Sequence, residues 1–471
     1  MRRYTLSVLL SFVALAAGCT VGPDYKKPEV PMPDAFLYQG NEALETVNIR
    51  WWQQFGDSVL DGLIAEALAN NKSIMVAVAN LEKAEARLWQ VRSPLFPQIG
   101  YSGDAARQRV SESTMGILPE NPHNSFQALL SASWEMDLWG RIRRLTEAAR
   151  ADMLATDEAK RGVILSLVAS TATTYLQLLG LDEQLFISKR SLAAYDESVQ
   201  LFEKQFAYGQ VSQMTVEQAR TQYETAAAAI PQIELQIAQA EHALSILLGR
   251  NPGPVSRGKT ISEITMPEIP GGIPSDVLVN RPDIRQAEQN LISLNAQIGA
   301  AKALYFPTIS LTGALGYASR DLSDLMDGNS QLWNVSGSLT GPIFTGGAIE
   351  GQVRQAEAAR KAALSNYELS IQNAFADVEN ALISRRKFAE KVQAEGRLVR
   401  AGQEYVRLAQ LQYHGGYVPY GTVLQAQQQL FPAELSYAQS RASLVIAVVN
   451  IYKAMGGGWI TEAAALTGPS R

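Results

Sequence analysis

The residue types that most often perform catalysis are sparse in this chain. Its 471 residues include three histidines, His123, His242 and His414, which are far apart in sequence. A histidine-based metal site or a nucleophile–histidine–acid triad would need partners that this spacing does not supply. Carboxylates are scattered along the predicted helices, and no pattern pairs them for acid–base chemistry. The sequence therefore gives no positive support for an enzyme.

A second candidate for chemistry is the glycine-rich segment Gly346-Gly347 with Gly351, which precedes a predicted helix. A phosphate-binding loop would need a Lys-Ser/Thr pair at the start of the helix, and a dinucleotide-binding loop would need Gly-x-Gly-x-x-Gly. Neither pattern is present in this segment. We therefore expect a bend between a strand and a helix, and no cofactor.

The one cysteine of the chain, Cys19, has a specific context. Arg2 and Arg3 are followed by an apolar run over residues 6–17 and by small residues up to Gly18. This layout is typical of a secretory signal peptide and is too short to span a membrane. We expect Cys19 to become the first mature residue and to carry a covalent lipid. The alternative is cleavage at the small residues with an incidental cysteine nearby. Thr20, rather than Asp, after the cysteine favours the outer membrane.

The composition limits the partners. The formal net charge is −5, and removal of Arg2 and Arg3 with the signal peptide makes it more negative. Nucleic-acid binding calls for a basic surface, so no nucleic-acid partner is expected. With one cysteine the mature chain forms no internal disulfide, and its stability must come from packing or assembly.

The chain repeats itself. Residues 95–99 (Leu-Phe-Pro-Gln-Ile) recur at 305–309 (Tyr-Phe-Pro-Thr-Ile), and Gly209-Gln210-Val211 recurs as Gly416-Tyr417-Val418. The separations stay near 207–210 residues. Several matches in one order predict a tandem duplication. The expected organisation is a signal peptide (1–18), an N-terminal segment (19–59), a first repeat (60–250), a Pro/Gly-rich linker (251–280), a second repeat (281–456) and a tail (457–471).

Each repeat has the same predicted elements. A helix of moderate length (60–91; 282–304) stops at a Phe-Pro signal. Two alternating segments follow, and then comes a very long helix (141–208; 352–414). A Gly-containing turn leads to a returning helix that ends near Gly249 or Gly456.

The long helices are unusual for a globular domain. About 65 residues of helix would be roughly 100 Å long, and such periodic stretches suggest a coiled coil, a membrane span or a helical repeat. Residues 162–181 carry no charge, but several Ser and Thr residues make the segment only moderately apolar. A wall helix with one polar face is favoured over a transmembrane helix.

The alternating segments place apolar residues at every second position. Four runs share this pattern, and their apolar positions are Ile99, Tyr101, Gly103 and Ala105; Phe126, Ala128, Leu130, Ala132, Trp134 and Met136; Ile309, Leu311, Gly313, Leu315 and Tyr317; Trp333, Val335, Gly337 and Leu339. The length and the period of two are typical of transmembrane β-strands. A half-buried sheet in a soluble domain gives the same alternation.

If these strands cross a membrane, the chain must oligomerise. Four strands cannot close a barrel, and an open sheet edge is not tolerated in lipid. Four strands per chain give eight in a dimer or twelve in a trimer, and the pattern alone does not choose between them.

Several motifs resemble those of the TolC-type outer-membrane factor family, in its lipoprotein branch (OprM-like, NodT-type). The matching segments cover nearly the whole mature chain: Cys19 to Tyr25 with Pro28; Trp51-Trp52 with Phe55 and Asp57; Trp134 to Gly140; Arg281-Pro282-Asp283-Ile284; and Tyr452 to Trp459. The resemblance implies an α+β membrane protein. It would be a homotrimer with a 12-stranded outer-membrane β-barrel, continued by a long periplasmic α-helical coiled-coil barrel.

The resemblance also implies a function. The chain would be the passive exit duct of a tripartite efflux system for multidrug resistance. Its partners would be a periplasmic membrane-fusion adaptor, an inner-membrane pump of the resistance-nodulation-division (RND) type, and outer-membrane lipid. Alternatives are a duct for type I protein secretion or metal export, or a periplasmic coiled-coil structural lipoprotein.

Site residues follow from the same resemblance, position by position. The tips that would dock to the adaptor are the two helix-to-helix turns, with Tyr208, Gly209, Gln210, Val211, Ser212, Gly415, Gly416, Tyr417 and Val418. The periplasmic gate would include Tyr413, Leu424 and Gln425. Relatives often carry an acidic residue at the position of Gln425, so an acidic ring is not expected at that level.

Overall fold

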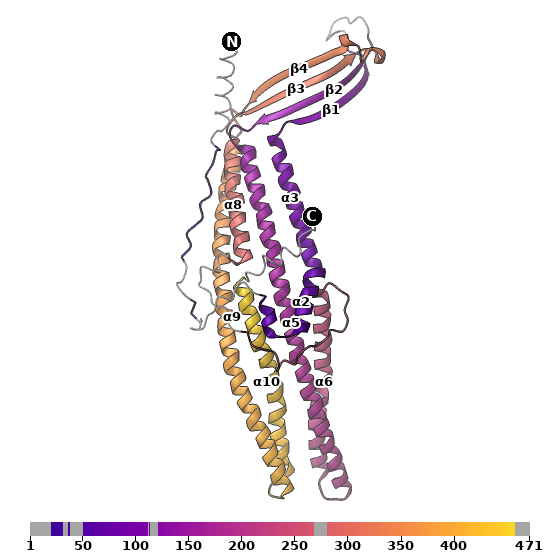
Figure 1. Cartoon of the computed structure of the whole chain (residues 1–471), viewed down its shortest axis with the longest axis vertical. Coiled ribbons are helices and arrows are strands. Elements are labelled where there is room, and N and C mark those ends of the chain that lie inside the picture. The colour runs from indigo at the N-terminus through magenta and orange to yellow at the C-terminus, as the bar shows by residue number, and fades with distance from the viewer. Residues whose placement is uncertain are drawn as a thin grey trace. The chain divides into compact units, whose positions relative to one another are not determined.

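The computed structural model describes residues 20–31, 36–37, 50–111, 113, 121–267 and 280–456. The signal peptide, Cys19 and the tail lie outside the described residues. The described residues are mostly helical and form one four-stranded sheet (Figure 1). Contacts divide it into two compact units, which are described separately. Unit 1 comprises Met1–Glu29, Asn80–Asp157 and Gln286–Glu368, and unit 2 comprises Val30–Ala79, Glu158–Arg285 and Leu369–Arg471.

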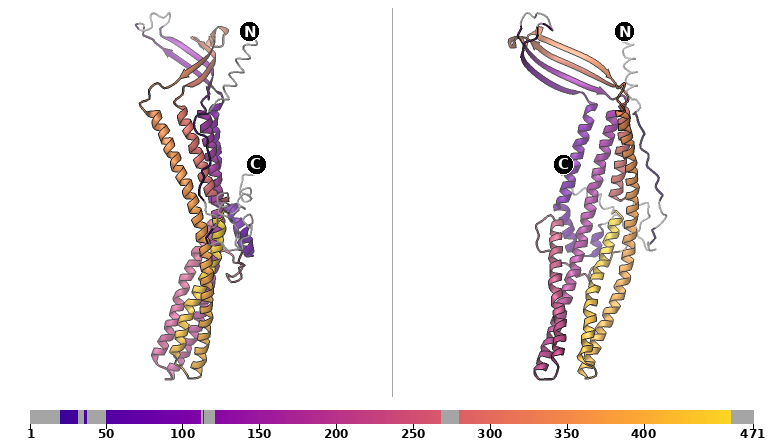
Figure 2. Two further views of the ribbon diagram at one scale, coloured as in Figure 1. Left: turned by 90° about the vertical axis from the view of Figure 1, so that its left-hand side faces the viewer. Right: turned by 180° about the vertical axis from the view of Figure 1, so that it is seen from behind.

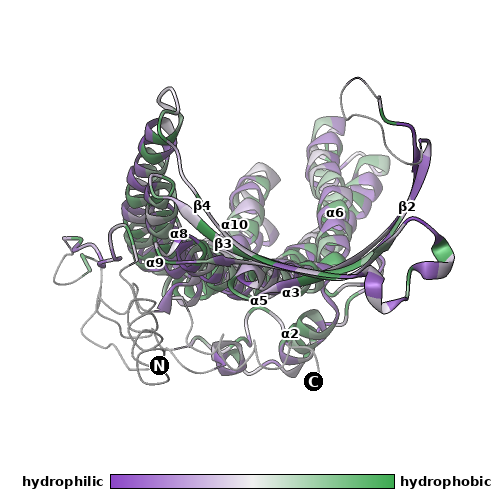
Figure 3. Cartoon of the chain, turned by 90° about the horizontal axis from the view of Figure 1, so that it is seen from above, coloured by the Kyte–Doolittle hydropathy of each residue, from purple (hydrophilic) through white to green (hydrophobic). Residues whose placement is uncertain are grey.

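The sheet belongs to unit 1. Its strands are β1 (Gln98–Gln108), β2 (His123–Met136), β3 (Thr308–Ser319) and β4 (Gln331–Thr340). They pair antiparallel in the order β1-β2-β3-β4, and the sheet is curved (Figure 3). Each half of the sequence thus supplies one hairpin, and β2 joins the two hairpins by pairing with β3.

The helical part of unit 1 contains most of α3 (Lys72–Arg92) and of α8 (Pro282–Ala303), with the first parts of α5 (Arg141–Ala207) and α9 (Ala348–His414). The extended segment 20–29 is fastened to this unit. Buried Arg144 donates hydrogen bonds to the carbonyl of Val21 (3.3 Å) and to the carboxylate of Asp24 (2.7 Å). Asn295 on α8 donates to the carbonyl of Pro23 (2.9 Å). These contacts link an N-terminal segment to helices from both halves of the sequence.

The described part of unit 2 consists of helices and the segments that connect them. It contains η1 (Trp51–Phe55), α2 (Ser58–Asn70), α6 (Gln213–Leu247), α10 (Tyr420–Ala454) and the remaining parts of α5 and α9. Two antiparallel hairpins, α5–α6 and α9–α10, make up most of it (Figure 2).

The two halves have matching helix lengths. Helices α5 and α9 contain 67 residues each, and α6 and α10 contain 35 each. The start and end of each helix differ from those of its counterpart by 207 positions, the spacing that the sequence repeat predicts. Both returning helices also contain an internal proline, Pro231 in α6 and Pro432 in α10.

One predicted helix is wrong in its extent. The sequence suggests a single helix over 60–91, whereas the structure has α2 and α3, separated at Asn71. The Asn71 backbone is extended, and its side-chain oxygen accepts hydrogen bonds from the backbone N–H groups of Ser73 (2.8 Å) and Ile74 (3.3 Å). Asn71 therefore ends one helix and caps the next, a role that favours asparagine.

The uncharged stretch of α5 is accounted for by packing. Within the described residues, α5 is the one helix long and apolar enough to cross a membrane by length and composition, and 61% of its most apolar window is buried. Ile164, Val168 and Leu176 are fully buried in the main core of unit 2. Burial against the chain's own helices explains the apolar composition of this segment.

Candidate functional site

The strand register places the apolar residues of all four strands on one face of the sheet. Leu130 of β2 lies opposite Tyr101 of β1 and Leu315 of β3, and Leu315 in turn lies opposite Trp333 of β4. Directly opposite residues point to the same side of a sheet. The alternation in the four separate segments therefore combines into one continuous apolar surface.

This apolar surface is not covered by the chain. Tyr101 is 90% exposed, Trp333 73% and Val335 77%. A contiguous exposed apolar face of this size marks an interaction with a membrane or another chain. It decides against the alternative of a half-buried soluble sheet, in which the apolar face would pack on a core.

The opposite face of the sheet is polar. Ser310 and Ser338 are joined by a hydrogen bond of 2.6 Å between their hydroxyl groups, and Thr312 and Ser336 by one of 2.7 Å. Gln127 and Asp104 lie opposite one another on the same face. An apolar face and a hydroxyl-rich face on one sheet are the arrangement of a barrel wall between lipid and water.

Both outer strands of the sheet have a free edge. In the strand order of the described chain, β1 pairs only with β2, and β4 pairs only with β3. The edge backbone groups would be unsatisfied in lipid, where each costs several kcal/mol. The sheet needs further strands beside β1 and β4 before it can enter a membrane.

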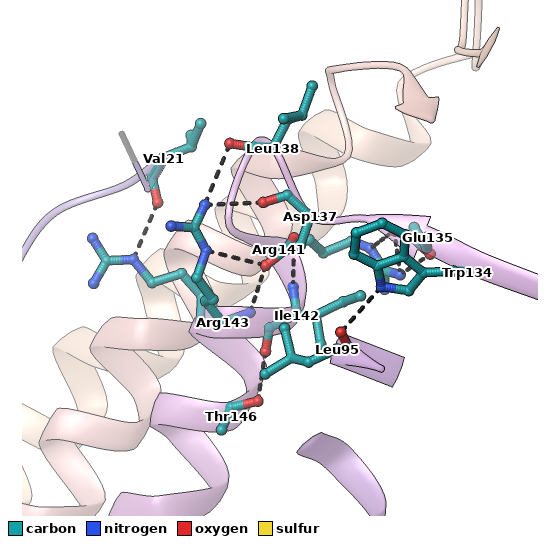
Figure 4. A network of polar contacts seen from close by, with 11 residues as sticks. Val21, Leu95, Trp134, Glu135, Asp137, Leu138, Arg141, Ile142, Arg143 and Thr146 are labelled. Atoms are coloured by element: carbon teal, nitrogen blue, oxygen red, sulfur yellow. Dashed lines mark hydrogen bonds and ion pairs between the residues drawn. The ribbon is translucent and has the colours of Figure 1, made fainter. Parts of the chain in front are cut away.

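The junction between β2 and α5 is held by a network of polar contacts (Figure 4). The carboxylate of Asp137 accepts hydrogen bonds from the backbone N–H groups of Ile142 (3.0 Å) and Arg143 (2.9 Å). These N–H groups open α5 and have no partner within the helix, so a carboxylate stabilises this end. The guanidinium of Arg141 binds both oxygens of Glu135 at 2.9 Å. The strand and the helix are thereby fixed to each other.

The corresponding junction of the second half is built differently. Phe344 occupies the position that Asp137 has in the first repeat, and its side chain is 91% exposed. Gly346 and Gly347 have φ values of +59° and +87° in the turn between β4 and α9. The predicted strand-to-helix bend is present here, and two glycines rather than an acidic residue lead into the helix.

The predicted docking tips are the two turns at the ends of the hairpins. Gly209 and Gly416 have positive φ values of +69° and +75°. In the first turn, the N–H of Gln210 donates to the carbonyl of Gln205 (2.8 Å) and the N–H of Gly209 to that of Phe206 (2.9 Å). Tyr417 and Gly416 make the same pair of bonds in the second turn. Both turns are therefore glycine-terminated Schellman motifs.

The turns are exposed. Tyr208 and Tyr417 are more than four-fifths exposed, and Gly415 and Gln210 are also exposed. Val211 and Val418 are half-buried, and the hydroxyl of Ser212 accepts a hydrogen bond from the N–H of Thr215 (3.4 Å) at the start of α6. The structure thus places the predicted tip residues in two exposed turns of unit 2.

The predicted gate residues lie just inside the second turn. The ring of Tyr413 packs against Phe202 of α5 and Tyr420 of α10, with centroids 6.4 and 5.4 Å away. Leu424 is 5% exposed and belongs to the same cluster, whereas Gln425 is exposed. Leu424 thus packs within the hairpins of its own chain, whereas the side chain of Gln425 is exposed.

The sequence interpretation missed an ion pair between the hairpins, in which the carboxylate is buried and the guanidinium is half exposed. Glu434 of α10 bonds to Arg190 of α5 at 2.6 Å and accepts a hydrogen bond from Gln403 of α9 at 3.1 Å. The sequence did contain a signal for this contact: Glu434 lies on the same helix face as Phe431 and Ala438, which are both buried. A charged residue among buried positions needs a partner.

In the described part of the chain, no group of three or more His, Cys, Asp or Glu side chains is arranged to hold a metal ion. The candidate functional features are surfaces: the two-faced sheet in unit 1 and the exposed turns in unit 2.

Comparison with known proteins agrees with this architecture. Residues 63–250 and 273–457 match the outer membrane efflux protein family. The toluene efflux pump outer membrane protein TtgC of Pseudomonas putida is 35% identical over 98% of this chain and 97% of its own length. The cation efflux system protein CusC of Escherichia coli is 33% identical over 96% and 98%.

A solved structure is similar over almost the full length. The open state of the MtrE outer membrane channel of Neisseria gonorrhoeae aligns with a TM-score of 0.85 and 30% identity, covering 94% of this chain and 99% of that one. The family consists of channels rather than enzymes. The chain belongs to the outer membrane efflux protein family and is an outer-membrane efflux duct.

Proposed function

We propose that three copies of the chain form one 12-stranded outer-membrane barrel that continues into a periplasmic α-helical tunnel. The observation that carries this proposal is the register that gathers the apolar side chains of four strands on one exposed face, with free edges at β1 and β4. Pairing β4 of one copy with β1 of the next would give the backbone groups of every strand edge hydrogen-bond partners. A barrel of this kind buries no unpaired backbone in lipid.

The proposed domain organisation follows the repeat. The boundaries are 60–250 for the first repeat and 281–456 for the second, with residues 251–280 between them. The equal helix lengths in the two halves support them. Each repeat would supply one strand hairpin to the barrel and one helical hairpin to the tunnel.

Cys19 is the proposed site of lipid attachment, on the basis of the signal peptide and the resemblance. One or two acyl chains tether a protein to a membrane without forming a pore, so the anchor would assist the barrel rather than replace it. Treatment with an inhibitor of lipoprotein signal peptidase should cause the uncleaved precursor to accumulate. An unchanged mature mass would exclude lipid attachment.

The turns 208–212 and 415–418 are the proposed docking sites for a periplasmic membrane-fusion adaptor, which would connect the duct to an inner-membrane RND-type pump. Their exposure and their tight glycine-terminated form support this role. Tyr413, Leu424 and Gln425 are proposed to form the periplasmic gate. Gln425 is exposed and uncharged, so the gate would carry no acidic ring at this level.

Labelling of intact cells tests the proposed topology. A cysteine placed at Asn329, in the described β3–β4 connection, should react with a membrane-impermeant maleimide added outside the cells. A cysteine at Gln210 should react only after the outer membrane is permeabilised. Equal labelling of both positions in intact and permeabilised cells would contradict a spanning barrel.

The exported compounds divide into two candidate classes. The relative TtgC is named for toluene and the relative CusC for cations, so organic solvents and metal ions are both candidates. Loss of the chain should sensitise its host to one class. Deletion followed by growth tests with toluene and with copper or silver salts would distinguish the two.

A further inference from the structure

In the sheet of unit 1, the end of β2 lies between the starts of β1 and β3. On one side, the indole N–H of Trp134 donates to the carbonyl of Leu95, just before β1 (3.0 Å, Figure 4). On the other side, Trp139 stacks on Phe306, just before β3, with centroids 4.6 Å apart. The indole N–H of Trp139 also donates to the carbonyl of Pro307 (2.7 Å). Both sides of this strand end are therefore closed by a tryptophan.

The end of β4 has one such neighbour in the described chain. A Cβ added at Gly341 would lie 2.9 Å from the Cβ of Pro307, so this strand end packs closely against the start of β3. The other side of β4 is the free edge of the sheet. Shortly after the strand, Ile343 is fully exposed and Phe344 is 91% exposed. Two large apolar side chains thus follow β4 at the edge where the described chain supplies no neighbouring strand.

Phe344 occupies a position at which the local structure favours an acidic residue. Its counterpart 207 positions earlier is Asp137, whose carboxylate accepts hydrogen bonds from the first N–H groups of α5. Carboxylates are favoured at this end of a helix because they satisfy these N–H groups and interact well with the helix dipole. A phenyl ring does neither, and the ring of Phe344 is exposed. This difference between the halves indicates that position 344 serves a contact outside its own chain.

An exposed aromatic residue also lies at the opposite edge of the sheet. Phe96 precedes β1 by the same interval as Phe306 precedes β3, and the two lie 210 positions apart. Phe306 is stacked against Trp139, whereas Phe96 is 56% exposed. The guanidinium of Arg92 lies 5.9 Å from the ring centroid of Phe96. The carbonyl of Phe96 accepts a hydrogen bond from the side chain of Gln98 (3.1 Å). This segment is thus held in place while much of the ring remains open.

We propose that Phe344, with Ile343, packs against Phe96 of the next copy of the chain. The contact does between copies what Trp139 and Phe306 do within one. This inference rests on the proposed function, in which β4 of one copy pairs with β1 of the next. β1 follows α3 and runs away from the helices, whereas β4 leads back to α9. Antiparallel pairing therefore places the end of β4 beside the start of β1, and the apolar side chains cover each other where the ring of strands closes.

Disulfide formation tests the contact directly in the double variant Phe96→Cys/Phe344→Cys. Within one chain the two positions lie at opposite edges of the sheet, about 14 Å apart for three strand spacings. This separation is too large for a disulfide within the chain. Mild oxidation of outer membranes should therefore link neighbouring copies and give covalent dimers and trimers that a reductant separates. Each single variant retains the natural Cys19 and should not cross-link, because identical positions are far apart in a three-fold ring.

The temperature at which the trimer dissociates in detergent gives a second test. Phe344→Asp gives position 344 the residue type of its counterpart in the first half, so the helical circular dichroism should be unchanged. The dissociation temperature should nevertheless fall by several degrees. Phe96→Ala should have a similar effect, and the double variant little more, since substitutions of residues in contact are not additive. Phe344→Trp should keep the wild-type temperature.

The matched control is Met326, an apolar residue of the same unit that is 74% exposed. It lies in the connection between β3 and β4, at the other end of β4 from Phe344. Met326→Asp makes the same kind of change, from a large exposed apolar side chain to a carboxylate. The dissociation temperature of the trimer should be that of the wild type, because this position is remote from the proposed contact.

The outcomes separate this inference from the proposed function. A wild-type trimer whose double cysteine variant gives no covalent dimer, by oxidation or with a short bismaleimide, would overturn the contact. Loss of the trimer in Phe344→Asp without such cross-linking would assign the ring to lipid instead. If the wild-type protein is not a trimer, the proposed barrel fails, and a covalent dimer through positions 96 and 344 would still establish the contact.

Discussion

The hydroxyl of Tyr175 on α5 donates a 2.8 Å hydrogen bond to the carboxylate of Asp57, which lies 118 positions earlier in the chain. Both side chains are fully buried in unit 2. The same carboxylate caps α2 through the N–H of Val59 (2.9 Å) and accepts a bond from the N–H of Lys259 (3.2 Å). One carboxylate thus joins the N-terminal helices, a long helix and the segment between the repeats.

The first prediction concerns this carboxylate. Asp57→Ala should lower the unfolding free energy by about 2–4 kcal/mol, because it removes a helix cap and leaves buried donors unpaired. Tyr175→Phe should cost less, since Asp57 keeps its backbone donors. The apparent melting temperature from circular dichroism in detergent would measure both. An equal or larger loss in Tyr175→Phe would show that Asp57 does not organise this region.

The second prediction concerns alkaline pH. Burial, helped by the nearby carboxylate of Glu434, raises the pKa of Tyr195 from 10 to about 12. The folded state therefore favours the neutral phenol. This contribution to stability, ~2–3 kcal/mol in all, is fully present below pH 10 and is lost as the pH rises from 10 through 12. Tyr195→Phe should weaken the loss of stability above pH 10. An identical pH profile for both proteins would contradict the assignment.

The third prediction concerns the turns. Glu in place of Gly209 or Gly416 must adopt a positive φ, which costs roughly 1–2 kcal/mol for an L-residue. It also adds a bulky charge to an exposed surface. No atom lies within 4 Å of a Cβ at either position, so the fold should persist while export fails. Asn, which tolerates this backbone conformation, is the matched control. Normal resistance of cells carrying both Glu variants would argue against docking at the turns.

The fourth prediction concerns the two faces of the sheet. Leu130 and Leu315 are directly opposite one another in the middle of the apolar face. Lys at either position should cost about 2–4 kcal/mol in the bilayer and reduce the amount of assembled protein. Ser131→Lys, one position away on the polar face, should assemble normally. Heat-modifiable mobility of membrane extracts would measure assembly, and equal loss in both variants would exclude a lipid-facing apolar surface.

The sequence alone predicted the elements of the sheet because alternation is local information. It could not establish that four segments share one apolar face, since this depends on the register between β2 and β3, which come from different halves. The duplicated long helices were likewise predictable from their period and their turn glycines.

Features that depend on a single side chain were harder to predict. The structure has two helices where the sequence predicted one, because the side-chain oxygen of Asn71 accepts hydrogen bonds from the first N–H groups of α3. Asparagine is more favourable in this capping position than inside a continuous helix. The partners of Glu434 and Asp57 lie more than 100 positions away, apart from Gln403 and the local cap of α2. Such contacts depend on how distant segments pack together, and no short sequence motif predicts them.

The most direct test of the account is the stoichiometry of the purified protein in detergent, measured by native mass spectrometry together with its conductance in planar bilayers. The free edges of β1 and β4 require an oligomer, and the proposed 12-stranded barrel makes it a trimer that conducts ions. A stable monomer that stays soluble in buffer without detergent would contradict it.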